Sequence, residues 1–246
     1  MCHQHTNFFL SHHRNGTTDL LNRIFPDIQV TPDPTFHFCL QFDCDKFTNN
    51  TEFLNNVSQL KRHILGGPLD RAFTDLDKGN APGSLSVYPY RMSETLYICP
   101  AAGKCTVIFL VDFQDSIDKA MAKIFLQEFV EGQRAVRTAP PVSYSKEPPL
   151  ELSSLKLVPR DNIAGFIAFS LEKRHVEGPK KENAITLLTI FRSYLHYHIK
   201  CAKTYLQMRM RKRVAGWLQV LNRAVPEIEK EKKTAGGKTF SRSSIV

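Results

Sequence analysis

Apolar residues recur at every third or fourth position over the last third of the chain. This stripe consists of Leu188, Phe191, Leu195, Ile199, Ala202, Leu206, Met210, Val214, Trp217 and Leu221. Steps of three and four residues keep side chains on one face of an α-helix. The spacing therefore predicts one long helix over 180–225, and Pro226 stops this helix or starts a short new one.

The length of this helix predicts that its C-terminal end extends beyond its own domain. About forty-five residues at about 1.5 Å each span more than about 60 Å. A domain of this size has a radius of gyration of about 15 Å, so its diameter is shorter than the helix. Apolar stripes belong more often to a chain's own core, but here the length favours a partner chain. We expect the partner's helix to cover the last apolar residues of the stripe, because isolated helices are marginal in water. These residues are Leu206, Met210, Val214, Trp217 and Leu221.

The segment before this helix, 49–179, predicts an α-β-β-β-α-β-β unit. We expect a helix over 50–76 that is interrupted or kinked at Gly66-Gly67-Pro68. Strands follow at 84–90, 94–99 and 104–111, and an amphipathic helix at 115–131 begins at Asp115 or Ser116 and ends at Gly132. The proline-rich stretch 138–152 is expected to be extended at a sheet edge, and 162–171 to be a buried strand.

The two ends of the chain lack this regularity. Residues 1–18 are polar and show no apolar period, so we expect disorder there. Residues 19–48 predict the end of a helix and a strand at 35–42. Residues 226–246 predict a flexible tail. The fold class is therefore α+β.

The composition of the chain is typical of a globular protein without a membrane span. Apolar residues make up 42% of the 246 residues and charged residues 23%, which suffices for a globular core. The longest apolar runs are too short to span a bilayer, and the first residues lack a signal-peptide pattern. The six cysteines show no disulfide framework spacing, which favours reduced thiols in the cytosol.

The positive charge is concentrated at the C-terminal end. From Lys173 onward there are 17 Lys and Arg residues against five Asp and Glu, whereas the rest of the chain has 16 against 19. On the long helix the basic side chains are Lys200, Lys203, Arg209, Arg211, Lys212 and Arg213. They either only keep the helix soluble or contact a polyanionic surface. The candidates are an acidic protein surface, an anionic membrane surface and a nucleic acid. For a nucleic acid, Tyr194, Tyr197 and Tyr205 are available for base stacking.

No pattern in the sequence supports catalysis, a cofactor or a metal. The segment GGKTF at 236–240 lacks the first glycine of a phosphate-binding loop. His196, His198 and Cys201 do not share one helical face, and the N-terminal Cys2, His3, His5, His12 and His13 lack zinc-site spacing. We therefore expect a protein that is not an enzyme.

Several stretches resemble one known family, subunit 2 of the actin-related protein 2/3 complex. They are KIFLQEFVEGQR (123–134), TAPPVSYSKEPPLEL (138–152), RHVEG (174–178), YLHYHIKCAKTYLQMRMRKR (194–213), VLNRAVPE (220–227) and GKTFS (237–241). The resemblance is strong from Ser84 to the end, weaker from Leu21, and not found over 1–18. Relative to the family, we expect the N-terminus to be shortened or divergent.

The resemblance implies a fold and a function. The family has two related α/β domains followed by a long C-terminal helix. The resemblance implies that residues 19–48 are the remnant of the first domain, which is expected to be incomplete here. This helix pairs with the matching helix of subunit 4 in a seven-subunit complex that nucleates actin branches. The pair also contacts the mother actin filament. The resemblance thus implies a non-catalytic scaffold subunit in the cytoplasmic actin cytoskeleton, at the cell cortex or in protrusions.

Overall fold

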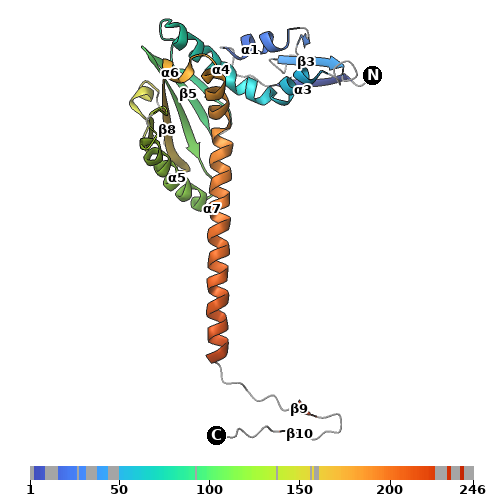
Figure 1. The fold of residues 1–246 in the computed structure, drawn as a ribbon, viewed down its shortest axis with the longest axis vertical. Helices are drawn as coiled ribbons and strands as arrows, with labels where there is room; N and C mark the ends of the chain where they lie inside the picture. The colour runs from blue at the N-terminus through green and yellow to red at the C-terminus, as the bar shows by residue number, and fades with distance from the viewer. Residues whose placement is uncertain are drawn as a thin grey trace. The chain divides into compact units, whose positions relative to one another are not determined.

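The computed structural model describes residues 3–8, 16–26, 28–31, 38–43, 50–91, 93–136, 138–155, 157, 161–224, 232–233 and 239–240. They fall into two compact units, 1–200 and 201–246. Helices and sheets are both present, as the predicted α+β class requires (Figure 1).

A five-stranded antiparallel sheet forms the centre of the first unit. Its strand order is β4-β5-β6-β8-β7. The strands are β4 (Ser86–Pro89), β5 (Thr95–Ala101), β6 (Lys104–Asp112), β7 (Val142–Ser145) and β8 (Ile163–Glu172). The proline-rich stretch supplies β7 at one edge, which confirms that prediction and agrees with the poor fit of proline in a central strand.

Both faces of the two longest strands are buried. On β6, Val107 and Phe109 face one apolar cluster, whereas Ile108 and Leu110 face the other. Successive side chains of a strand point to opposite faces. The near-continuous apolar sequence of β6 thus reflects a sheet that is covered on both sides.

Three helices pack on one face of this sheet (Figure 1). They are α4 (Leu60–Lys78), α5 (Ser116–Arg134) and the first part of α7 (Lys180–Ala224). A one-turn 3-10 helix, η1 (Leu150–Leu152), contributes Leu152 to the opposite face, and α6 (Lys173–Val176) links β8 to α7. The predicted α-β-β-β-α-β-β order is therefore present in this segment.

Helix α5 begins as predicted but ends later. The Asp115 carboxylate accepts hydrogen bonds from the backbone N–H groups of Ile117 (2.7 Å) and Asp118 (3.1 Å), which caps the helix. Gly132 does not end α5, since the helix continues to Arg134 and its C-cap residue, Ala135, keeps a right-handed conformation. This end of the helix does not need the left-handed conformation that favours glycine.

The predicted interruption at Gly66-Gly67-Pro68 is wrong. The helical segment breaks instead at Gln59, between α3 (Thr51–Ser58) and α4, and α4 runs through Pro68. A proline inside a helix leaves the carbonyl four residues earlier without its donor. Here the Thr17 hydroxyl donates to that carbonyl, Ile64 O, over 3.2 Å. A Cβ on Gly67 would lie 2.5 Å from the Thr17 Cα, so this glycine permits the close approach.

The N-terminal segment is more ordered than its sequence predicts. β1 (His3–Phe8), β3 (Phe38–Asp43) and β2 (Gln29–Val30) form a three-stranded antiparallel sheet in the order β1-β3-β2. The expectation of disorder over 1–18 is therefore wrong for 3–8 and for 17–18, where α1 (Thr17–Ile24) begins. Backbone pairing with β3 forms β1 without any apolar period in its sequence. Whether 19–48 is the remnant of a related domain stays a prediction.

The second unit holds the rest of α7 and two short strands. The helix is continuous from Lys180 to Ala224, within a residue of the predicted bounds. β9 (Lys232–Lys233) pairs with β10 (Thr239–Phe240). Most of the predicted flexible tail lies outside the described residues.

Candidate partner interface

The apolar stripe of α7 changes from buried to exposed along the helix. Leu195 and Ile199 are each 1% exposed and contribute to the apolar cluster on the sheet. From Thr204 to Arg223 every side chain is exposed. The five predicted interface residues lie in this part, with exposed fractions of 44% for Leu206, 63% for Met210, 57% for Val214, 68% for Trp217 and 54% for Leu221.

These five side chains share one face of a regular helix. Exposed apolar residues that occur singly need no explanation, but a contiguous apolar surface marks an interaction site. Trp217 is the only tryptophan of the chain, and tryptophan is enriched among the residues that dominate binding energy at protein interfaces. The arrangement therefore suits a second helix packing along α7.

Basic side chains flank this apolar face on two sides. Arg209 and Lys212 lie on one side of the helix, and Lys200 and Arg211 lie on the other. Lys203 and Arg213 lie at the apolar face itself, because they are seven residues from Met210 and Leu206 respectively. All six predicted basic residues are exposed except Lys203, which is partly buried. The guanidinium of Arg209 lies over the ring of Tyr205, 5.6 Å from its centroid, in a cation–π contact.

A shallow hollow lies on the first of these sides. Its volume is about 730 Å³, and it is lined by Tyr205, Arg209, Lys212, Arg213, Gly216, Trp217 and Val220. The sequence prediction named Tyr205 only for base stacking, and it missed Gly216 and Val220. The sequence did contain one signal for this hollow, the glycine at position 216. A glycine within a long exposed helix weakens that helix by about 1 kcal/mol relative to alanine, so its presence indicates a special role.

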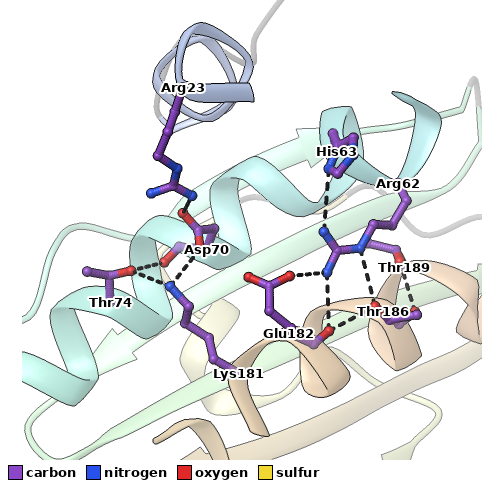
Figure 2. Close-up of polar contacts among 9 residues, drawn as sticks. All are labelled: Arg23, Arg62, His63, Asp70, Thr74, Lys181, Glu182, Thr186 and Thr189. Atoms are coloured by element: carbon purple, nitrogen blue, oxygen red, sulfur yellow. Dashed lines mark hydrogen bonds and ion pairs between the residues drawn. The ribbon is translucent and has the colours of Figure 1, made fainter. Parts of the chain in front are cut away.

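Two polar networks fix the beginning of α7 within the first unit. In the first, Asp70 of α4 pairs with Lys181 of α7 at 2.8 Å and with Arg23 of α1 at 3.1 Å (Figure 2). Lys181 also donates to the Thr74 hydroxyl over 3.1 Å. Asp70 is buried, so its pairing with two cations offsets the cost of desolvating a carboxylate.

Arg62, also on α4, forms further polar contacts with α7. Its guanidinium pairs with the Glu182 carboxylate and donates to the Glu182 carbonyl (3.2 Å) and the Thr186 hydroxyl (3.2 Å) (Figure 2). Beside it, His63 is buried against the ring of Phe25. Burial and the neighbouring Arg62 charge lower the pKa of His63 below its ordinary value of 6.5.

The second network surrounds Glu94, before β5. This carboxylate is only 2% exposed and pairs with Arg192 of α7, with Arg91 at 3.8 Å and with His196 at 3.7 Å. The His196 ring also stacks on Phe113, with centroids 4.5 Å apart. Burial raises the pKa of Glu94, but hydrogen bonds and charges from His196 and Arg192 outweigh burial, so the net effect lowers this pKa.

A second apolar hollow lies within the first unit. It has a volume of about 1150 Å³ and is bounded by α5, β7, β8 and the first part of α7. Leu187, Ile190 and Tyr194 of α7 contribute exposed apolar surface to it. This surface is typical of a chain that carries more than one protein contact.

Neither a metal-binding cluster nor a membrane-spanning helix is present among the described residues. Among these residues, no group of three metal-binding side chains lies close enough to hold an ion. No described helix is both long and apolar enough to cross a bilayer.

Comparison with known proteins identifies the family. The model of the family described as "Arp2/3 complex, 34 kD subunit p34-Arc" matches residues 4–228. The chain belongs to the p34-Arc family. A Schizosaccharomyces pombe relative, "Actin-related protein 2/3 complex subunit 2", is 36% identical over 93% of this chain and 80% of its own length. The Dictyostelium discoideum protein of the same name is 36% identical over 94% of this chain and 79% of its own length.

Membership in the p34-Arc family confirms the resemblance drawn from the sequence and corrects its extent. The match begins at residue 4, so the N-terminal residues that seemed unrelated to the family belong to it. It also confirms the prediction of a structural subunit of the Arp2/3 complex rather than an enzyme.

Proposed function

We propose that this p34-Arc chain pairs through the exposed part of α7 with the matching helix of subunit 4. In this proposal the pair forms the core of the Arp2/3 complex in the cytoplasmic actin cytoskeleton, at the cell cortex or in protrusions, and contacts the mother actin filament. The complex then supports actin nucleation and branching.

One observation carries the proposal. Leu206, Met210, Val214, Trp217 and Leu221 are all exposed on one face of a continuous helix. Burying each such side chain contributes about 1.5–3 kcal/mol before the costs of association. A family whose members are subunits of a complex supplies the reason for leaving this surface uncovered.

Co-purification tests the pairing. A tagged copy of the full chain, expressed in cells, should recover six companion proteins, two of them actin-like. Mass spectrometry identifies the companions, and gel filtration shows whether they elute as one complex. Recovery of the chain as a monomer would contradict the proposal.

The filament contact is assigned to the six basic residues Lys200, Lys203, Arg209, Arg211, Lys212 and Arg213. Actin is acidic, so exposed cations on the complex would attract it. The sharpest test reverses Lys200, Lys203 and Arg211 to glutamate, because these three do not line the hollow at Gly216.

We expect the assembled variant complex to bind actin filaments at least about tenfold more weakly in co-sedimentation, since each exposed ion pair contributes up to about 1 kcal/mol. The wild-type interaction should also weaken as salt is added. Unchanged binding by the assembled variant would remove these residues from the filament contact.

Nucleic-acid binding by the same basic helix is the alternative function. Tyr205 could stack on a base, but in the structure its ring already has a guanidinium over it. A gel shift with steep salt dependence would support this alternative. Membrane-surface binding is the third candidate, and liposome flotation tests it.

A further inference from the structure

We propose that the hollow around Gly216 receives an acidic amphipathic helix of the partner subunit, whose carboxylates pair with Arg209, Lys212 and Arg213. This inference rests on the proposed function, which names a partner helix but does not say which side chains that helix carries. It also narrows the proposed filament contact from six basic residues to the three that do not line the hollow, Lys200, Lys203 and Arg211.

The charge of α7 argues for an acidic partner. No Asp or Glu residue occurs between Asn183 and Ala224, whereas Lys203, Arg209, Arg211, Lys212, Arg213 and Arg223 all lie after residue 200. Two copies of this segment packed together would bring like charges against each other, which is strongly unfavourable at an interface. A helix with carboxylates beside its apolar face would neutralise these cations instead.

The glycine at position 216 is independent evidence that a partner approaches α7 closely here. A Cβ at Gly216 would meet nothing within 4 Å, so the chain's own packing does not require a glycine here. Glycine nevertheless weakens a helix interior relative to alanine. Absence of a side chain allows another backbone or a large side chain to approach α7 closely. Trp217 and Val220 line the same hollow and offer apolar contacts beside it.

The position of the hollow separates the basic residues of α7 into two sets. Its cations are Arg209, Lys212 and Arg213, whereas Lys200, Lys203 and Arg211 are not among its lining residues. A partner helix seated at Gly216 therefore covers the first set. The second set lies outside this contact, and we assign it to the actin filament.

Substitutions at Gly216 test the steric part in the full chain, co-expressed with its companions in cells. Gly216→Leu should reduce recovery of the companion subunits at least tenfold. Gly216→Ala should reduce recovery less, although both changes favour the helix and so cannot act by unfolding it. Ala215→Leu adds the same side chain at the next position, outside the hollow, and should leave recovery unchanged. Wild-type recovery with Gly216→Leu would overturn the inference.

A carbodiimide, which joins amines to carboxylates that are already in contact, tests the charge pairing in the purified wild-type complex. Mass spectrometry should find Lys212 joined to an Asp or Glu residue in a helical segment of a companion subunit. A Lys212 link found only to actin, after filaments are added, would assign this side to the filament and overturn the inference. Links from Lys212 to no companion would overturn it as well.

The two proposals fail in different ways. If wild-type chain recovers no companions, the proposed function fails and the inference fails with it. If wild-type chain recovers them and simultaneous reversal of Arg209, Lys212 and Arg213 to glutamate does not reduce recovery, only the inference fails. Its success requires at least a tenfold loss in that variant.

Discussion

The two parts of α7 have the same apolar spacing but opposite surroundings. Between Ile185 and Ile199 the stripe packs on the central sheet and is almost fully buried. From Leu206 to Leu221 it continues in the same rhythm, yet each of its side chains is at least 44% exposed. A helical period therefore predicts that a face is covered, but it does not say whether the chain itself or a partner covers it.

Polar contacts distinguish the two parts as well. The buried part is held by Asp70, Arg62 and Glu94, which lie on other elements and pair with Lys181, Glu182 and Arg192 of α7. The exposed part carries cations and no carboxylate. The first part packs and pairs within its own unit, whereas the second leaves its cations and apolar side chains exposed.

The largest effect on the isolated chain is expected in the buried part. Phe191→Ala should lower the free energy of unfolding by about 3–5 kcal/mol, because it removes a large side chain from a close-packed core. The Phe191 ring contacts Phe109, Phe129 and Phe169. Urea denaturation of the free chain measures the change, and a loss below about 1 kcal/mol would contradict the packing described here.

The ion pairs of the buried part should give the next effect. Arg192→Met should lower the free energy of unfolding by about 3 kcal/mol, since removing one partner leaves a buried charge poorly compensated. Urea denaturation at neutral pH measures this change. If Arg192→Met were neutral, the Glu94 network would not fix α7 to the sheet.

The sign of the pH dependence follows from the lowered pKa of Glu94. Folded protein binds the proton less tightly than unfolded protein, so the stabilisation is full above the ordinary pKa of 4.5 and is lost as pH falls below it. Glu94→Gln should be less stable than the wild type at neutral pH. It should also lose less stability than the wild type between about pH 5 and about pH 3. An unchanged acid dependence in this variant would exclude Glu94 as its source.

In the exposed part, Trp217→Ala should affect partner binding rather than the stability of the isolated chain. The free energy of unfolding of the isolated chain should change by less than about 0.5 kcal/mol, because the side chain is exposed. Pairing with subunit 4 should weaken by about 2 kcal/mol or more, as expected for a central tryptophan. Titration of the purified heterodimer measures the second effect, and an unaffected heterodimer would indicate that this face has another role.

The smallest and most closely matched comparison uses two methionines. Met208 and Met210 are each 63% exposed, but only Met210 belongs to the apolar stripe. Met210→Ala should weaken pairing by about 1 kcal/mol, whereas Met208→Ala should change it by less than about 0.5 kcal/mol. Equal effects in the heterodimer titration would place the contact on a different face.

Local sequence patterns predicted much of the fold. The bounds of α7 are within a residue of the prediction because its three-and-four spacing continues without a break. The N-cap at Asp115 was also predicted, since capping uses residues that are neighbours in the chain. By contrast, β1 was missed because strand pairing with β3 depends on residues far along the sequence.

Contacts between distant residues explain the other errors. Helix α4 runs through Pro68 because Thr17 supplies the hydrogen bond that proline cannot. The sequence predicted only part of the candidate site. The spacing revealed the apolar stripe, but the α7 partners of Asp70 and Glu94, Lys181 and Arg192, lie about a hundred residues away in sequence. No local pattern predicts such pairs.

Hydrogen–deuterium exchange along α7 tests the central claim most directly. Backbone amides between Ile185 and Ile199 should exchange slowly both in the free chain and in the complex, because the sheet covers them. Amides between Leu206 and Leu221 should exchange rapidly in the free monomer and become protected on assembly. Strong protection of Leu206–Leu221 in a free chain shown to be monomeric would contradict the claim that a partner covers this part of the helix.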